Sequence, residues 1–177
     1  NTASVGAPWD DDNGRGAVAA YLFATTTGTQ IAKLLASGGA ADDRFGTTVA
    51  ISGTTAIVGA YDDDNSPESG SAYLFDTTTG TQLLKLLPSD GAADDEFGRS
   101  VANDRSAGNV WGPRGAHNGY GSCNAYFFHR TTGINNPKPP ACGRAGDDRC
   151  GTPVEDRGTT RSVGGNEDTE SDERQSR

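Results

Sequence analysis

Two runs of aspartate are the residues whose type and spacing best suit metal chemistry. They occupy residues 10–14 (DDDNG) and residues 62–65 (DDDN). Calcium takes six to eight oxygen ligands, which a tight loop supplies from alternating positions. Oxygen-bearing side chains fall at the first, third, fifth and seventh positions of the second loop, and the first loop begins the same pattern. The predicted calcium ligands are Asp62, Asp64, Ser66 and Glu68, together with Asp10 and Asp12.

The same loops have a simpler interpretation as solvated acidic surface that favours solubility. Both lack the bidentate acid that usually closes a calcium loop. In the first run, Gly14 and Gly16 take the later positions. The incomplete pattern favours the simpler interpretation, and residues 62–68 are the best candidate if either loop binds calcium.

No other residue pattern in the sequence points to catalysis or to a second metal. His117 and His129 are twelve residues apart and have no matched cysteine or carboxylate at zinc spacing. The three cysteines form no C-x-x-C pair, and their odd number argues against a disulfide framework. Motifs such as GxSxG, HExxH and the P-loop are absent from the sequence. We therefore expect a protein that is not an enzyme, with no catalytic residues and no cofactor other than calcium.

Charge and composition exclude two classes of partner. The formal net charge is −9, so polyphosphate would be repelled and nucleic-acid binding is not expected. No apolar run approaches the ~18 residues that span a bilayer, so we expect no membrane insertion in this segment. A signal-peptide pattern is missing, the chain contains no methionine and it begins at Asn1, which leads us to expect a piece of a longer protein.

An internal repeat organises the chain. The motif AYLF-x-TTTGTQ occurs at residues 20–30 and again 52 residues later. The segment GAADDRFG at residues 39–46 returns as GAADDEFG, also 52 residues on. A weaker third copy includes NAYFFHRTTG at residues 124–133, and a fourth echo, RAGDDRCGTPV, stands at residues 144–154. The C-terminal part is therefore a degenerate repeat rather than a second domain, either a decayed copy or the product of a sequencing error.

One repeat contains four segments with strand character, bounded by turn residues. They are Thr47–Ser52, Thr54–Tyr61, Ser71–Phe75 and Gln82–Leu87. Lys85 interrupts the last segment and is expected at a solvent-facing or edge position. Four strands in a repeat of 40–50 residues are typical of a β-propeller blade, which needs neighbouring blades to bury its faces. We expect the recurring aromatic residues to pack between blades: Tyr21, Phe23, Phe45, Tyr73, Phe75 and Phe97.

Small and acidic residues recur between the strands. The pairs Gly6-Ala7 and Gly59-Ala60 are expected to let neighbouring backbones approach closely. A second acidic set precedes each Phe-Gly pair. There we expect Asp42 and Asp94 to brace the turn into the next blade by accepting backbone N–H groups.

These residues resemble the FG-GAP repeat, the blade unit of the integrin α-subunit β-propeller and of many bacterial surface and secreted proteins. Phe45-Gly46 and Phe97-Gly98 supply FG, and Gly6-Ala7-Pro8 supplies GAP, whereas the second copy has Gly59-Ala60-Tyr61. The resemblance implies a seven-bladed propeller in the parent protein, usually extracellular and usually a scaffold for binding or adhesion. Integrin-type blades carry a calcium loop of the form Dx[DN]x[DN]GxxD, which neither aspartate run completes.

We therefore expect an all-β fold, a partial β-propeller of four-stranded antiparallel blades of the FG-GAP type with a poorly ordered C-terminal part. Residues 1–133 would form the blades, divided into a partial first unit (1–44), a complete second unit (45–96) and a degraded third unit (97–133). Residues 134–177 would be a degenerate repeat remnant and a disordered charged tail.

The function that the resemblance implies is a non-enzymatic binding or adhesion scaffold, a fragment of a secreted or cell-surface protein. Its partners would be an unidentified protein or glycan ligand on a cell surface or in a matrix, and the other blades of the parent propeller. Two alternatives stay open at this point. One is a propeller appendage of an extracellular hydrolase or lyase, and the other is a degraded repeat fragment without activity.

Overall fold

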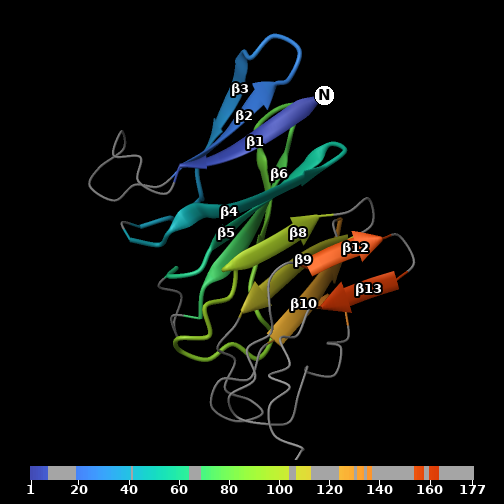
Figure 1. Cartoon of the computed structure of the whole chain (residues 1–177). Coiled ribbons are helices and arrows are strands. Elements are labelled where there is room, and N and C mark those ends of the chain that lie inside the picture. Colours follow the sequence, from blue (N-terminus) through green and yellow to red (C-terminus); the bar gives the residue numbers. More distant parts are fainter. Residues whose placement is uncertain are drawn as a thin grey trace, which may run out of the picture.

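The chain is all-β, as predicted. The computed structural model describes residues 1–7, 19–40, 42–63, 69–103, 107–112, 124–129, 131–133, 135–136, 154–157 and 160–163. Within these ranges there is no helix (Figure 1). The strands are β1 (Thr2–Ala7), β2 (Ala19–Ala24), β3 (Gln30–Leu34), β4 (Phe45–Ser52), β5 (Thr55–Ala60), β6 (Ser71–Asp76), β7 (Gln82–Leu86), β8 (Ser100–Asn103), β9 (Ala107–Gly112), β10 (Asn124–His129), β11 (Asn135–Asn136), β12 (Val154–Arg157) and β13 (Thr160–Val163).

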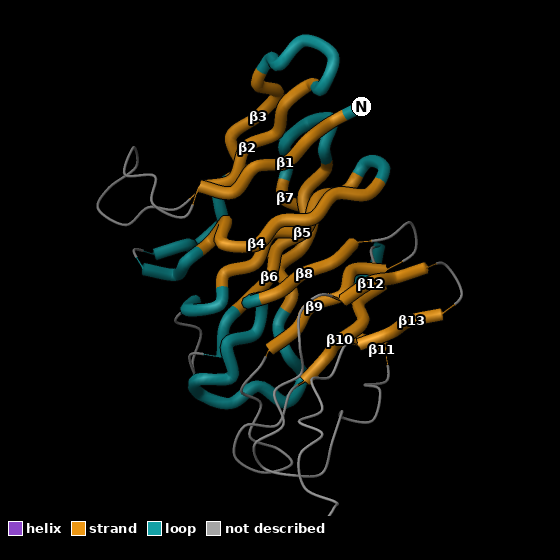
Figure 2. The backbone as a smooth tube through the Cα atoms, in the orientation of Figure 1, coloured by secondary structure: helices purple, strands orange, loops and turns teal. Residues whose placement is uncertain are grey.

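The strands form small antiparallel sheets that follow one another along the chain (Figure 2). The first blade has the order β1-β2-β3, the second β4-β5-β6-β7, and the third β8-β9-β10-β11. β12 and β13 form a separate hairpin. Neighbouring sheets lie against each other, with β1 beside β4, β4 and β5 beside β8, and β8 beside β12. Each blade is an up-and-down meander, which is the blade arrangement of a β-propeller.

Local sequence explains the β6–β7 hairpin of the second blade. The turn after β6 places Gly80 at a φ of 72°, and the equivalent Gly28 has a φ of 70°. Such left-handed positions favour glycine. Asp76 accepts the backbone N–H groups of Thr78 and Thr79 at 2.8 and 2.9 Å, which closes the turn. β7 then runs as a strand and ends just before Pro88.

The core lies between blades because successive residues of β5 and β6 face opposite neighbours. Towards the first blade they present Val58, Tyr73 and Phe75, which pack with Leu22 and Leu34. Towards the third blade the two strands present the alternate residues, which pack with residues from the third blade. That second cluster contains Ile57, Ala72, Leu74, Leu86, Phe97, Val110, Tyr126 and Phe128. A blade of this sequence therefore buries both faces only between two neighbours.

The phenylalanine of each Phe-Gly pair packs on two aromatic rings of its own blade. Phe45 meets Tyr73 and Phe75 edge-on, with ring centroids 5.5 and 5.9 Å apart. Phe97 meets Tyr126 and Phe128 in the same way, at 5.1 and 5.8 Å. Edge-to-face packing at this separation suits the quadrupoles of the rings. Phe45, Tyr73, Phe75 and Phe97 lie in the buried clusters between blades, as predicted, whereas Tyr21 and Phe23 are only half-buried.

Glycines carry the contact between successive blades. A Cβ atom at Gly6 would collide with the Gly46 carbonyl oxygen, and one at Gly59 would collide with the Gly98 carbonyl oxygen. The expected close backbone approach is thus present, and each contact joins the Gly-Ala pair of one blade to the Phe-Gly pair of the next. In the third blade, Trp111 holds the position that Gly59 holds in the second. It pairs with Ser100, as Gly59 pairs with Thr48.

The decayed copies keep the strand register of the intact one. β12 pairs with β13 through Val154 and Val163, which lie 105 residues after the paired Val49 and Val58. β11 has only two residues and is followed by Pro137, which cannot donate a backbone hydrogen bond to a ladder. The predicted repeat remnant and disordered charged tail, residues 134–177, lies outside the described residues except for β11, β12 and β13.

Candidate functional site at the loop ends of the blades

The predicted metal ligands belong to connections that leave one end of the blades. In the second blade Ala60 pairs with Ser71, so the β5–β6 connection leaves from the same end at which β4 begins. Backbone hydrogen bonds tie this connection to its neighbours, from Asp62 N to Asp43 O at 3.3 Å and from Phe97 N to Ser69 O at 2.9 Å. We call this end, with the β1–β2, β3–β4, β5–β6 and β7–β8 connections, the loop end.

Only one of the six predicted calcium ligands is among the described residues. Asp62 is exposed, and its Oδ2 lies 3.1 Å from Nε of Arg44 in an ion pair. The other five lie outside the described residues: Asp10, Asp12, Asp64, Ser66 and Glu68. Among the described residues, no three His, Cys, Asp or Glu side chains are grouped so that they could hold a metal ion. Calcium binding by the 62–68 loop therefore stays a prediction.

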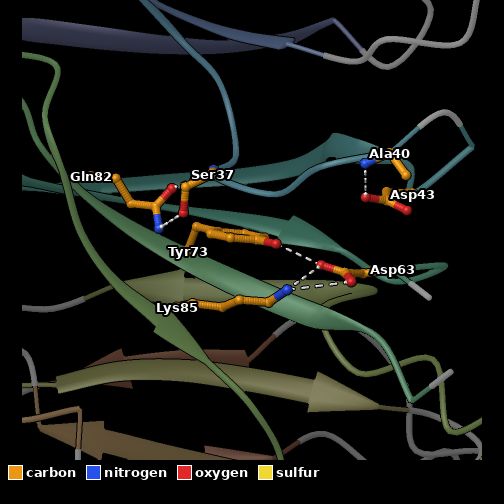
Figure 3. A network of polar contacts seen from close by, with 7 residues as sticks. All are labelled: Ser37, Ala40, Asp43, Asp63, Tyr73, Gln82 and Lys85. Carbon is orange, nitrogen blue, oxygen red and sulfur yellow. Dashed lines mark hydrogen bonds and ion pairs between the residues drawn. The ribbon is translucent and has the colours of Figure 1, made fainter. Parts of the chain in front are cut away.

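Asp63, which was not predicted as a site residue, forms a buried polar contact at the loop end (Figure 3). Its Oδ2 accepts the Tyr73 hydroxyl at 2.6 Å and lies 3.1 Å from Nζ of Lys85. The Lys85 amine also stands 5.3 Å from the centroid of the Tyr73 ring. Lys85 lies on an edge strand, as predicted, and its amine turns inward to a buried carboxylate.

This arrangement holds Tyr73 firmly protonated. Burial is the main reason why the pKa of its hydroxyl is raised, and the hydrogen bond to Asp63 adds to the effect. The negative charges of Asp63 and Asp43 raise the pKa of the hydroxyl further. A tyrosine in this state donates a hydrogen bond and serves neither as a base nor as a nucleophile at neutral pH.

The connections between blades repeat one backbone conformation. Asp42 and Arg44 have φ of 72° and 57°, and Asp94 and Glu96 have φ of 65° and 53°. Asp43 and Asp95 each lie between two residues in the left-handed conformation, and both aspartates are buried. They close the connection by accepting a backbone N–H three residues back.

The bracing aspartates are Asp43 and Asp95, so the expectation that Asp42 and Asp94 would do this was wrong by one residue. Asp43 Oδ2 accepts Ala40 N–H at 2.6 Å, and Asp95 Oδ2 accepts Ala92 N–H at 2.8 Å. Asp42 and Asp94 lie exposed at the surface instead. Their left-handed φ tolerates an aspartate better than it tolerates most side chains.

Two further contacts cross the loop end. The Tyr126 hydroxyl, at the position of Tyr73 in the third blade, donates to Asp90 Oδ1 at 2.7 Å. Arg44 and Arg99 both stand over the ring of Tyr61, with guanidinium carbons 5.9 and 5.4 Å from its centroid. Hence the same aromatic position finds a carboxylate in the second and third blades, and the half-buried Tyr61 links the connections on either side of the second blade.

Comparison with protein families supplies the identification. The family model for the FG-GAP repeat matches residues 29–75 and 81–128, which together make up more than half of the chain. The chain belongs to the FG-GAP repeat family. No curated protein matches it. Each FG-GAP match runs from the outer strand of one blade through three strands of the next, so the sequence repeat is shifted against the blade.

Sequence reasoning missed Asp63, Tyr73 and Lys85 as one contact group, although a signal was present. Tyr21 and Lys33 stand 52 residues before Tyr73 and Lys85, and Lys33 lies 5.5 Å from the centroid of the Tyr21 ring. A tyrosine and a lysine that recur at the repeat spacing on adjacent strands indicate a shared partner. The second residue of the aspartate run is that partner in the second blade.

Proposed function

We propose that this FG-GAP chain is part of a non-enzymatic binding or adhesion scaffold of a secreted or cell-surface protein, with its ligand face at the loop end. The observation that supports this best is that the aspartates of the loop end form two sets, one buried and one exposed. Asp43, Asp63 and Asp95 are buried and accept hydrogen bonds that brace the connections. A scaffold needs such rigid connections, because a preformed loop loses less entropy when it binds.

The exposed carboxylates are what such a face would offer to a ligand. Asp42, Asp62 and Asp94 are exposed at the loop end, and Asp42 and Asp94 hold equivalent positions of successive connections. An acidic row of this kind attracts a basic protein surface and repels an acidic glycan. Within the described residues no helix is long and apolar enough to cross a membrane.

Calcium belongs to the same proposal. Asp62, Asp64, Ser66 and Glu68 would hold it in the second blade, and Asp10 and Asp12 would start the equivalent site in the first. A bound cation would offset the repulsion among adjacent aspartates. It would also turn part of the acidic face into a site for carboxylate or hydroxyl groups of a ligand.

Surface plasmon resonance with immobilised matrix proteins and glycans, in calcium and in chelator, tests the proposal. We expect the Asp42→Asn/Asp94→Asn variant to bind its ligand at least ~5-fold more weakly than the unmodified chain. The control is Asp76→Asn, which removes a charge at the opposite end and keeps an oxygen for the turn. If both variants lose affinity equally, the ligand face does not lie at the loop end. A glycan whose mass changes on incubation would overturn the non-enzymatic assignment.

A further inference from the structure

A lysine, an aspartate and a tyrosine of the second blade meet where β6 and β7 lie side by side (Figure 3). Tyr73 pairs with Lys85 across these two strands, and Asp63 reaches both from the connection that follows β5. The backbone N–H of Asp63 donates to Ala60 O at 3.3 Å, which holds the residue against the end of β5. Rigid strands therefore position all three side chains.

The lysine amine faces both oxygens of the carboxylate. Nζ of Lys85 lies 3.1 Å from Asp63 Oδ2 and 3.4 Å from Asp63 Oδ1. Because the amine is close to both oxygens, it also faces Cγ, the carbon that joins them. Groups held at about 3–3.5 Å in a fixed orientation react as if each were present at very high concentration. The contact therefore favours attack of the nitrogen on the carboxyl carbon.

The Tyr73 hydroxyl acts on the same carboxyl group. It donates to Asp63 Oδ2 at 2.6 Å, and its raised pKa keeps it protonated. A fixed donor at this oxygen stabilises the negative charge that develops there when the carbon is attacked. The side chains of Asp63 and Lys85 are only 2% and 27% exposed, and Tyr73 shares its buried cluster with Phe45 and Phe75. Water therefore has little access to hydrolyse a bond formed here.

We propose that Lys85 and Asp63 form an isopeptide bond between Nζ and Cγ, an intramolecular cross-link that the folded blade makes by itself. One proton passes from the Lys85 ammonium to the Asp63 carboxylate, and the neutral amine attacks Cγ. A second proton of the amine then leaves with one carboxyl oxygen as water, so atoms and charge balance without a further reactant. Holding two charges out of water costs free energy, and condensation to a neutral amide removes that cost.

The cross-link joins the β5–β6 connection to the outer strand of the blade. Among the described strands, β7 pairs only with β6. A bond from Asp63 to Lys85 closes a covalent loop around β6, and such a closure restricts the unfolded chain as a disulfide does. The cross-link needs no partner molecule, so it is independent of the ligand face proposed above.

Mass spectrometry of the purified full chain tests the proposal. After incubation at neutral pH we expect the intact chain to be lighter than its sequence by at least one water. A protease digest should contain a branched peptide that joins Asp63 to Lys85. Lys85→Arg keeps the positive charge beside Asp63 and should abolish this peptide. The matched control is Asp62→Asn, at the exposed neighbour, which should retain it. Far-UV circular dichroism verifies that each variant folds.

Two further variants test the chemistry. Asp63→Asn should give the same branched peptide with loss of ammonia in place of water, because the amide nitrogen then leaves. Tyr73→Phe should slow formation of the bond at least ~10-fold, because the donor to the carboxyl oxygen is removed.

The proposal is refuted if the folded chain yields no branched peptide, since Asp63 and Lys85 then form an ion pair alone. It is also refuted if Lys85→Arg loses water to the same extent, because the loss would then come from another residue, such as a succinimide at Asp90-Gly91. An unchanged rate of bond formation in Tyr73→Phe would refute the mechanism.

Discussion

Replacing Gly59 with alanine tests the packing between the second and third blades most directly. The added Cβ atom would collide with the Gly98 carbonyl oxygen and lie 3.0 Å from its carbon. Neither is the end of a flexible side chain, so the blades must part. Overpacking costs about 1–3 kcal/mol. The hydrogen bond from Thr48 Oγ1 to Gly98 O, 2.9 Å long, would also be lost. Its loss would lower the free energy of unfolding by about 1 kcal/mol more.

We therefore expect Gly59→Ala to lower the free energy of unfolding by about 3 kcal/mol, measured by urea titration followed by circular dichroism. At about 2–4 °C per kcal/mol for a chain of this size, Tm should fall by about 6–12 °C. The control is Gly108→Ala, also in a strand, where the new Cβ meets two side-chain methyls, Ile57 Cδ1 at 3.2 Å and Leu74 Cδ2 at an ordinary 3.9 Å. Its effect should stay within about 1 kcal/mol because the Ile57 methyl can move. Equal effects of the two substitutions would refute the packing argument.

Two further predictions concern titration and calcium. The raised pKa of Tyr73 means that unfolded chains lose this proton first, so stability should fall as pH rises above the ordinary tyrosine value of ~10. In absorbance at 295 nm one tyrosine should ionise only with unfolding, and Tyr73→Phe should remove that late step; a step unchanged in the variant would contradict the assignment. Calcium at 10 mM should stabilise the chain by about 1.4–2.7 kcal/mol if Kd is about 10⁻⁴–10⁻³ M, magnesium should do so less, and Asp62→Asn/Asp64→Asn should abolish the difference. Identical melting in calcium and in chelator would leave the acidic loops as solvated surface.

The repeat spacing predicted most of the fold. The strand expected at Thr54–Tyr61 is Thr55–Ala60, and the one expected at Gln82–Leu87 is Gln82–Leu86. Such accuracy follows because alternating small and large residues must face two neighbouring blades in turn. The 52-residue period also predicted that the aromatic residues of the second and third blades share one environment, since equivalent positions of stacked sheets meet equivalent neighbours.

The bracing contacts could not be predicted in the same way. Whether Asp42 or Asp43 points inward depends on the left-handed φ of Asp42 and Arg44, and a run of acidic residues does not encode which of them takes that conformation. Lys85 was ambiguous for a related reason. An edge strand tolerates lysine with its amine in water or over a ring, and only the position of Asp63 decides between them.

The shift between the FG-GAP repeat and the blade bears on how such arrays change length during evolution. Each match ends inside the third strand of a blade and begins near the outer strand of the one before. A duplication of one such unit inserts a complete contact between two blades, including the Phe-Gly pair and its connection. It does not insert one isolated blade. Unequal crossing-over can therefore lengthen or shorten the array without creating a mismatched contact between neighbouring blades.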